Sequence, residues 1–258
     1  MKNIIKSLSI MGLLSMIILL LVNCSGYKKL NKALSNPEGV TKIKIKYARL
    51  DSLPTNIENL KDLKTLYLFK NGLTSIPEEI GNLKNLETLV ISSNKLIDLP
   101  SSIGRLTKLK KLSLKHNKIK LLPPEIGNLT ELKEFHIEYN YLGKLPSEIG
   151  KLKNLEFLYL NDNKLKAIPN EIGNLINLRF LVIGKNSLDC LPYEIGNLTS
   201  LTELNVAFCG PMVKIPESII NCKRLEFIFI DKSILLPYSI NSINPRLQVI
   251  IKEKGELN

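Results

Sequence analysis

An asparagine that returns every 23 residues constrains the fold of this chain more than any other feature. It belongs to the frame L-x-x-L-x-L-x-x-N-x-L, whose regular copies carry Asn71, Asn94, Asn117, Asn140, Asn163 and Asn186. Self-similarity at a fixed period of this length means that each repeat is one structural unit, which buries its apolar face only by stacking on its neighbours. We therefore expect one elongated array.

Each part of the repeat predicts a local structure. The alternating leucines predict a short strand whose alternate side chains point into the core. The asparagine has donor and acceptor groups, so we expect stacked copies to form a ladder of hydrogen bonds in the bend after the strand. A proline fixes φ where the return segment begins, and Ile80 and Leu83 with their equivalents bury a short helical turn. Gly81 and its counterparts are expected to keep that turn from becoming a strong helix.

The unit is best seen at 76–96, where it is I-P-E-E-I-G-N-L-K-N-L-E-T-L-V-I-S-S-N-K-L. From about residue 40 to residue 233, the chain resembles the short, 23-residue variety of the leucine-rich repeat family. The resemblance implies an α/β solenoid, a horseshoe with a parallel concave β-sheet and short helical turns on the convex side. It also implies protein binding as the function, without a cofactor.

The residues that flank the repeats predict how the array begins and ends. Leu30, Ala33 and Leu34 are spaced as on one face of a helix, and we expect this helix to cover the open edge of the first repeat. The frame loses its asparagine at Cys209 and Ser233, as terminal repeats do. We expect a signal peptide at 1–23, a linker and capping helix at 24–39, about nine repeats at 40–236 and a C-terminal cap and tail at 237–258, with a last irregular strand near 247–251 and no second domain.

The first residues form a leader. Lys2 and Lys6 precede an apolar run that is typical of a secretory signal and shorter than the roughly 20 residues of a membrane-spanning helix. The ending L-V-N-C at 21–24 resembles a bacterial lipobox, which implies lipidation at Cys24 as in bacterial leucine-rich repeat lipoproteins. Ser25 rather than aspartate follows, which favours the outer membrane and leaves periplasmic or surface exposure open. An uncleaved membrane anchor and an ordinary signal peptide are the alternatives.

The variable strand positions are expected to face the concave side, and aromatic residues gather there. Six of the seven phenylalanines and four of the eight tyrosines, Tyr47 included, fall on these positions. Aromatic side chains offer large contact area at low entropic cost, so this density predicts a protein-binding surface. The other interpretation is that aromatics simply suit exposed strand positions. The residues predicted to bind are Tyr67, Phe69, Tyr139, Phe157, Tyr159, Phe180, Phe208, Phe227 and Phe229.

Lysines occupy the same side of the first repeats, and the chain carries a formal net charge of +12. Lysines that alternate along the first strand permit a polyanion, such as a glycan or an anionic head group, to dock by charge. The competing interpretation is that they solvate an edge strand and prevent aggregation. The residues predicted for polyanion binding are Lys42, Lys44, Lys46, Lys111 and Lys115.

The sequence predicts no enzyme, no metal site and no disulfide framework. His116 and His136 fall on concave positions of adjacent repeats, without the ligand spacing that a metal or a catalytic site needs. Cys209 takes an asparagine position and Cys222 a leucine position, so both are expected to be buried and structural. Cys190 has no predicted role.

These patterns together predict a monomeric, non-enzymatic scaffold of the bacterial cell envelope with no nucleic-acid partner. It would bind a protein, such as a host surface protein, through the concave aromatic strip. The alternatives are binding of a polyanion or glycan, and a purely structural envelope protein.

Overall fold

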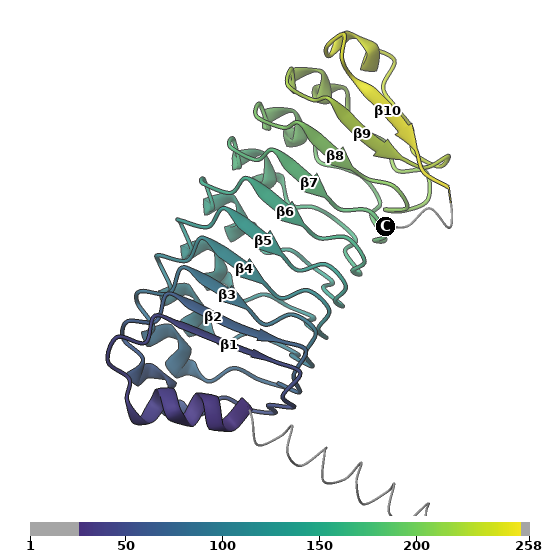
Figure 1. The fold of residues 1–258 in the computed structure, drawn as a ribbon. Helices are drawn as coiled ribbons and strands as arrows, with labels where there is room; N and C mark the ends of the chain where they lie inside the picture. The colour runs from purple at the N-terminus through teal and green to yellow at the C-terminus, as the bar shows by residue number, and fades with distance from the viewer. Residues whose placement is uncertain (1–25, 254–258) are drawn as a thin grey trace, which may run out of the picture.

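A ten-stranded parallel sheet runs through the molecule in chain order (Figure 1). The computed structural model describes residues 26–253, so the predicted signal peptide, the predicted lipidation residue Cys24 and residues 254–258 lie outside the described residues. The strands are β1 (Lys42–Lys46), β2 (Thr65–Phe69), β3 (Thr88–Val90), β4 (Lys111–Ser113), β5 (Glu134–His136), β6 (Phe157–Tyr159), β7 (Phe180–Val182), β8 (Glu203–Asn205), β9 (Phe227–Ile230) and β10 (Gln248–Ile251).

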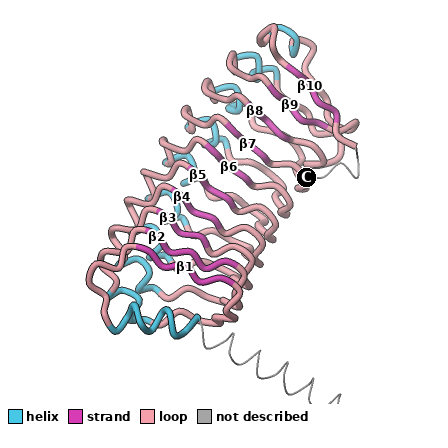
Figure 2. The backbone as a smooth tube through the Cα atoms, in the orientation of Figure 1, coloured by secondary structure: helices cyan, strands magenta, loops and turns pink. Residues whose placement is uncertain are grey.

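Short 3-10 turns return the chain on the opposite side of the stack from the sheet (Figure 2). The first eight turns each follow a proline with extended backbone, as at Pro77, whose φ is −71°. They are η1 (Thr55–Asn59), η2 (Glu78–Asn82), η3 (Ser101–Arg105), η4 (Pro124–Asn128), η5 (Ser147–Lys151), η6 (Asn170–Asn174), η7 (Tyr193–Asn197), η8 (Glu217–Asn221) and η9 (Ile240–Ser242). The horseshoe solenoid expected from the repeats is confirmed.

The pairing register places equivalent residues of successive repeats side by side. Leu66 pairs with Leu89, and Leu89 pairs with Leu112, so each position of the repeat forms a column across the sheet. Compared with the 23-residue period, the sequence distance between paired residues is one residue longer from β8 to β9 and two residues shorter from β9 to β10. The last strand expected near 247–251 is therefore β10, which continues the sheet beyond residue 236.

Leucine and isoleucine side chains fill the space between the sheet and the turns along the whole stack. At the N-terminal end, the helical segment 26–35 buries Leu30 completely against the first repeat, and Figure 1 shows this helix below β1. Tyr27 and Leu34 pack on the same core. Within residues 26–253, no helix combines the length and apolar character needed to cross a bilayer.

The asparagine ladder forms as expected. In Asn163, Oδ1 accepts a hydrogen bond from the Leu142 backbone N–H at 2.9 Å, and Nδ2 donates to the carbonyl oxygens of Ile137 and Leu160, both at 3.0 Å. Each regular asparagine thus ties its own bend to the preceding repeat. Cys209 occupies the asparagine position but has no amide side chain. Its backbone carbonyl oxygen instead accepts the hydrogen bond from the Leu188 N–H, at 2.6 Å.

The glycines of the turns have a role in packing that the sequence did not indicate. A Cβ atom added to Gly81 would lie 2.4 Å from the carbonyl oxygen of Ser102 in the next repeat, far inside van der Waals contact. The same close approach to the following repeat, at 2.3–2.6 Å, recurs at Gly104, Gly127, Gly150, Gly173 and Gly196. Glycine is therefore needed because neighbouring turns stack too closely for a side chain, a reason that the expectation based on weak helix propensity did not include.

The residue before each asparagine lies in a left-handed bend. Tyr139 has φ of 57° and Asp162 has φ of 55°, values that cost non-glycine residues energy. The same conformation recurs from Tyr47 to Phe208 along the array. Because of this bend, these side chains do not continue the alternation of the strand, and they lie at the rim of the concave face.

The described cysteines differ in environment. Cys209 and Cys222 are fully buried, and Cys190 is exposed. Burial is the main cause that raises the pKa of each buried thiol to about 12. Because the thiolate is the reactive form, both buried cysteines should be inert at ordinary pH.

We expect iodoacetamide at pH 8 to modify Cys190 in the folded protein and to leave Cys209 and Cys222 unmodified until denaturant is added. Peptide mass mapping of the alkylated protein measures this directly. Modification of Cys209 at the rate of Cys190 in the folded state would contradict the burial that the structure assigns to the asparagine position of this repeat.

Candidate functional site

The parallel sheet forms the concave face, and Figure 1 shows no described segment lying across it. We call the position that begins each of β1–β10 the first column and the position two residues later the second column. The first column is Lys42, Thr65, Thr88, Lys111, Glu134, Phe157, Phe180, Glu203, Phe227 and Gln248. The second column is Lys44, Tyr67, Val90, Ser113, His136, Tyr159, Val182, Asn205, Phe229 and Ile250.

The predicted aromatic strip divides into two groups. The N-terminal group contains Tyr67 and Phe69 of β2, with Tyr47 in edge-to-face contact with Phe69 at a centroid distance of 5.7 Å. Lysines cover these rings: Lys46 Nζ lies 5.0 Å from the Tyr67 centroid, and Lys70 Nζ lies 5.4 Å from that of Tyr47. The N-terminal aromatics therefore belong to a basic surface.

Small and polar side chains separate the two groups. On the concave side between β2 and β5, Val90, Ser92 and Ser113 are buried, and the two serine hydroxyls are hydrogen-bonded at 2.7 Å. No large apolar side chain fills these places, so the strip expected from the sequence is discontinuous.

The second group, which we call the C-terminal aromatic cluster, consists of Phe157, Tyr159, Phe180, Phe227 and Phe229. Phe157 and Phe180 are stacked with ring centroids 5.0 Å apart, and Phe227 and Phe229 are stacked at 6.4 Å. All five side chains are half-buried, so each ring keeps an accessible face while its neighbours fix its position.

Tyr139 and Phe208 occupy the left-handed bend at the rim rather than the strands. Tyr139 stacks on His116 with centroids 4.2 Å apart. Both rim aromatics border a groove of about 310 Å³ whose walls also include Tyr159 and Glu203. The groove joins these two predicted residues to the C-terminal aromatic cluster.

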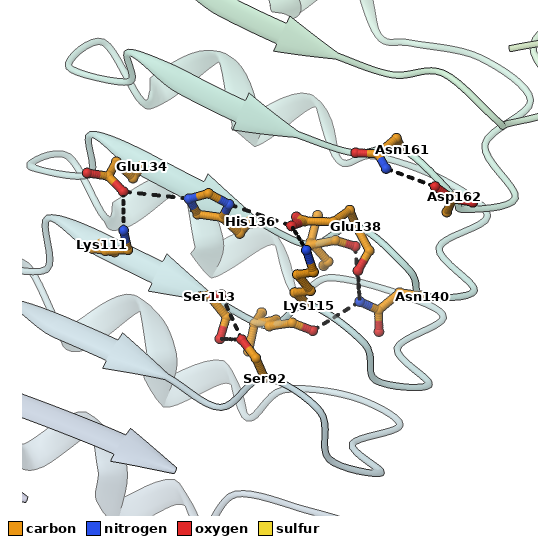
Figure 3. A network of polar contacts seen from close by, with 12 residues as sticks. Ser92, Lys111, Ser113, Lys115, Glu134, His136, Glu138, Asn140, Asn161 and Asp162 are labelled. Carbon is orange, nitrogen blue, oxygen red and sulfur yellow. Dashed lines mark hydrogen bonds and ion pairs between the residues drawn. The ribbon is translucent and has the colours of Figure 1, made fainter. Parts of the chain in front are cut away.

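A network of charged side chains lies along β4, β5 and the residues that follow them (Figure 3). Lys111 is ion-paired with Glu134, and Lys115 Nζ lies 3.4 Å from Glu138 Oε1. His136 lies between the two carboxylates, with its ring nitrogens 3.6 and 3.7 Å from their oxygens. Two of the five lysines predicted for polyanion binding are thus neutralised by acidic partners, and Lys42, Lys44 and Lys46 are the three that share one exposed strand face.

Burial and charge oppose one another in this network. Glu138 is almost completely buried, which acts to raise the pKa of its carboxyl group, but the neighbouring His136 and Lys115 outweigh burial and hold that pKa below its usual value. For His116, burial and the charge of Lys115 lower the pKa of the ring. Among residues 26–253, no three histidine, cysteine, aspartate or glutamate side chains are grouped to hold a metal ion.

One concave residue was missed by searching for aromatics alone. Glu203 stands in the first column between Phe180 and Phe227, inside the C-terminal aromatic cluster. It lies 23 residues after Phe180, so comparing every residue type along each column would have revealed it from the repeat spacing.

The comparisons with known proteins agree with this architecture. The family profile described as "Leucine-rich repeat region" matches residues 51–140 and 125–209, which together span more than half of the chain. The chain belongs to the leucine-rich repeat family. No curated protein matches this leucine-rich repeat chain.

Solved leucine-rich repeat structures resemble it over most of its length. A leucine-rich repeat protein of Leptospira interrogans is 29% identical, with a TM-score of 0.60, over 88% of this chain and 76% of that one. The ectodomain of the Arabidopsis thaliana receptor kinase GASSHO1/SCHENGEN3, in complex with CASPARIAN STRIP INTEGRITY FACTOR 2, is 29% identical with a TM-score of 0.70, over 78% of this chain and 25% of that one. An internalin of Listeria monocytogenes shares the fold, with a TM-score of 0.71 at 20% identity over 86% of this chain and 64% of that one.

Proposed function

We propose that this leucine-rich repeat protein is a non-enzymatic scaffold that binds a protein partner through the C-terminal aromatic cluster. The proposal includes attachment to the bacterial cell envelope by a lipid on Cys24, which is based on the leader sequence. The plant receptor ectodomain to which the chain is similar was solved with a bound factor, which supports binding as the function of the array.

The observation that carries the proposal is the ordered, uncovered set of five aromatic side chains on β6, β7 and β9. Half-buried rings are already immobilised by stacking, as for Phe157 and Phe180, so little side-chain entropy remains to be lost when a partner covers them. Interface residues that contribute most to affinity are enriched in aromatics held in this way. Other exposed apolar side chains, such as Leu121 and Tyr193, lie outside the two concave columns.

The test is to replace Phe157, Tyr159, Phe180 and Phe227 with alanine and to repeat partner capture from an envelope or host-surface extract. We expect affinity for the captured protein to fall at least about tenfold, the equivalent of about 1.4 kcal/mol, because hot-spot aromatics often contribute more than this. Circular dichroism and thermal unfolding establish that the variant is folded.

Tyr193→Ala is the matched control. Tyr193 is an exposed aromatic on η7, on the convex side, and its removal should leave capture unchanged. If the folded fourfold variant retains every partner, the concave cluster is not the binding surface.

Polyanion binding is retained as the second candidate because of β1. Lys42, Lys44 and Lys46 project from the same face of this strand, and the charge of Lys42 is the main cause that lowers the pKa of Lys44. An anion placed among them would relieve this repulsion. The test is a triple variant in which Lys42, Lys44 and Lys46 are all replaced with alanine. Loss of partner capture in this variant, together with a steep fall of wild-type capture as salt is added, would favour polyanion binding over binding through the aromatic cluster.

A further inference from the structure

The C-terminal aromatic cluster contains one acidic group that the proposed function does not use. Glu203 begins β8, and the parallel register places it next to Phe180 of β7 on one side and next to Phe227 of β9 on the other. The side chain is half-buried on the same open face as the rings. A single carboxylate therefore interrupts a row of phenylalanines.

Glu203 differs from the other acidic residues of the concave face because its charge is unpaired. Glu134 and Glu138 are paired with lysines, and Asp162 Oδ1 lies 3.4 Å from Lys185 Nζ. Asp231 accepts hydrogen bonds from Ser233. Within residues 26–253, the carboxylate of Glu203 has neither a hydrogen bond nor an ion pair.

The cation whose charge acts on Glu203, Lys252, is directed toward an aromatic ring. Lys252 borders the same groove, but its Nζ lies 5.1 Å from the centroid of Phe229, in a cation–π position. Its charge lowers the pKa of the Glu203 carboxyl less than burial raises it, so the pKa stays above its usual value. A half-buried carboxylate without a partner costs free energy that an added cation would recover.

The surrounding rings favour the same kind of ligand. The guanidinium carbon of Arg179 lies 5.9 Å from the Phe180 centroid, and Lys252 lies over Phe229, so two rings of the cluster already interact with cations of this chain. Aromatic faces attract ammonium and guanidinium groups through their electron-rich surface. A carboxylate between such rings has the charge and the apolar walls that suit the head and stem of a long basic side chain.

We infer that the C-terminal aromatic cluster takes up a basic side chain of the protein partner, arginine or lysine, with Glu203 as its counter-ion and Phe180 and Phe227 as its walls. This inference rests on the proposed function and specifies the partner chemistry that the concave face selects. A partner segment that presents arginine or lysine between apolar residues complements this surface by its charge and by its apolar contacts.

The test uses the full chain and two capped pentapeptides, Gly-Leu-Arg-Leu-Gly and the same peptide with neutral citrulline in place of arginine. Citrulline keeps the length and shape of arginine and removes the charge. We expect calorimetric titration to show the arginine peptide binding about tenfold tighter than the citrulline peptide, because only the charged guanidinium forms a charge-assisted hydrogen bond with the carboxylate.

Glu203→Gln should abolish this preference, and Glu171→Gln, which removes an exposed carboxylate on the convex turn η6, should preserve it. Lys252→Gln should leave arginine-peptide binding unchanged or tighter, because it removes a competing cation. The inference is overturned if the arginine peptide does not bind, or if the two peptides bind equally. It is also overturned if the preference for arginine persists in Glu203→Gln, or if binding requires Lys252.

The fourfold aromatic variant separates this inference from the proposed function. If the two peptides bind the wild type equally and the aromatic variant binds neither, the concave face still binds and only the role of Glu203 is wrong. If the aromatic variant binds both peptides and its protein partner as well as the wild type does, the proposed binding face itself is wrong.

Discussion

Replacing Asn140 with alanine is expected to lower the free energy of unfolding by about 3 kcal/mol, because one buried polar group left unsatisfied costs about 1–3 kcal/mol. Asn140 Oδ1 accepts from the Ile119 N–H at 3.0 Å, and Nδ2 donates to the carbonyl oxygens of Leu114 and Ile137, each at 3.0 Å. The substitution removes these bonds at the middle of the array, where the backbone groups are shielded from water. Urea unfolding followed by circular dichroism measures the loss.

The matched control is Asn128→Ala in the same repeat. Asn128 is exposed at the end of η4, and its replacement should change stability by less than about 0.5 kcal/mol. Because each repeat contacts mainly its neighbours, the Asn140 variant should also unfold less cooperatively. Equal effects of the two substitutions would show that the asparagine ladder does not hold the repeats together.

Replacing Gly127 with alanine is expected to destabilise the protein by about 1–3 kcal/mol, the usual cost of overpacking. The added Cβ would lie 2.5 Å from the Glu148 carbonyl oxygen and 2.8 Å from the Glu148 Cβ, so the next repeat would have to move. If glycine served only to weaken the helical turn, alanine would instead stabilise it. The sign of the change in unfolding free energy therefore distinguishes the two explanations.

Gly143→Ala is the control for this experiment. A Cβ at Gly143 meets no atom within 4 Å, and its φ is not left-handed. This substitution should be neutral or stabilise the protein by up to about 1 kcal/mol, since it restricts the unfolded chain. Thermal melts of the two variants side by side provide the comparison, and a Gly127 variant that melts at or above the wild type contradicts the stacking explanation.

The sequence was sufficient for the parts of the fold that depend only on spacing. A constant period determines which residues become neighbours, so the asparagine ladder, the proline at the start of each regular turn and the columns of the concave face followed from it. The reason for the turn glycines did not follow, because it depends on the distance between Gly81 and Ser102, which belong to different repeats.

The candidate site was predictable in composition and less so in arrangement. The census of aromatics indicated that these side chains gather on the concave face, but it did not show that Lys46 would cover Tyr67 or that Lys111 would pair with Glu134. Those contacts depend on how long side chains bend toward adjacent columns. The isolation of Glu203 was equally hidden, because it depends on Lys252, which directly follows β10 and lies over Phe229.

Site-specific photo-cross-linking in intact cells tests the proposed binding face most directly. Phe180 is replaced with the photoreactive residue p-benzoylphenylalanine, and Tyr193 on the convex side is replaced in the same way as the reference. We expect irradiation to join a second protein covalently to the chain from position 180 and not from position 193. Adducts that form from position 193 and not from position 180 would contradict binding through the concave aromatic cluster.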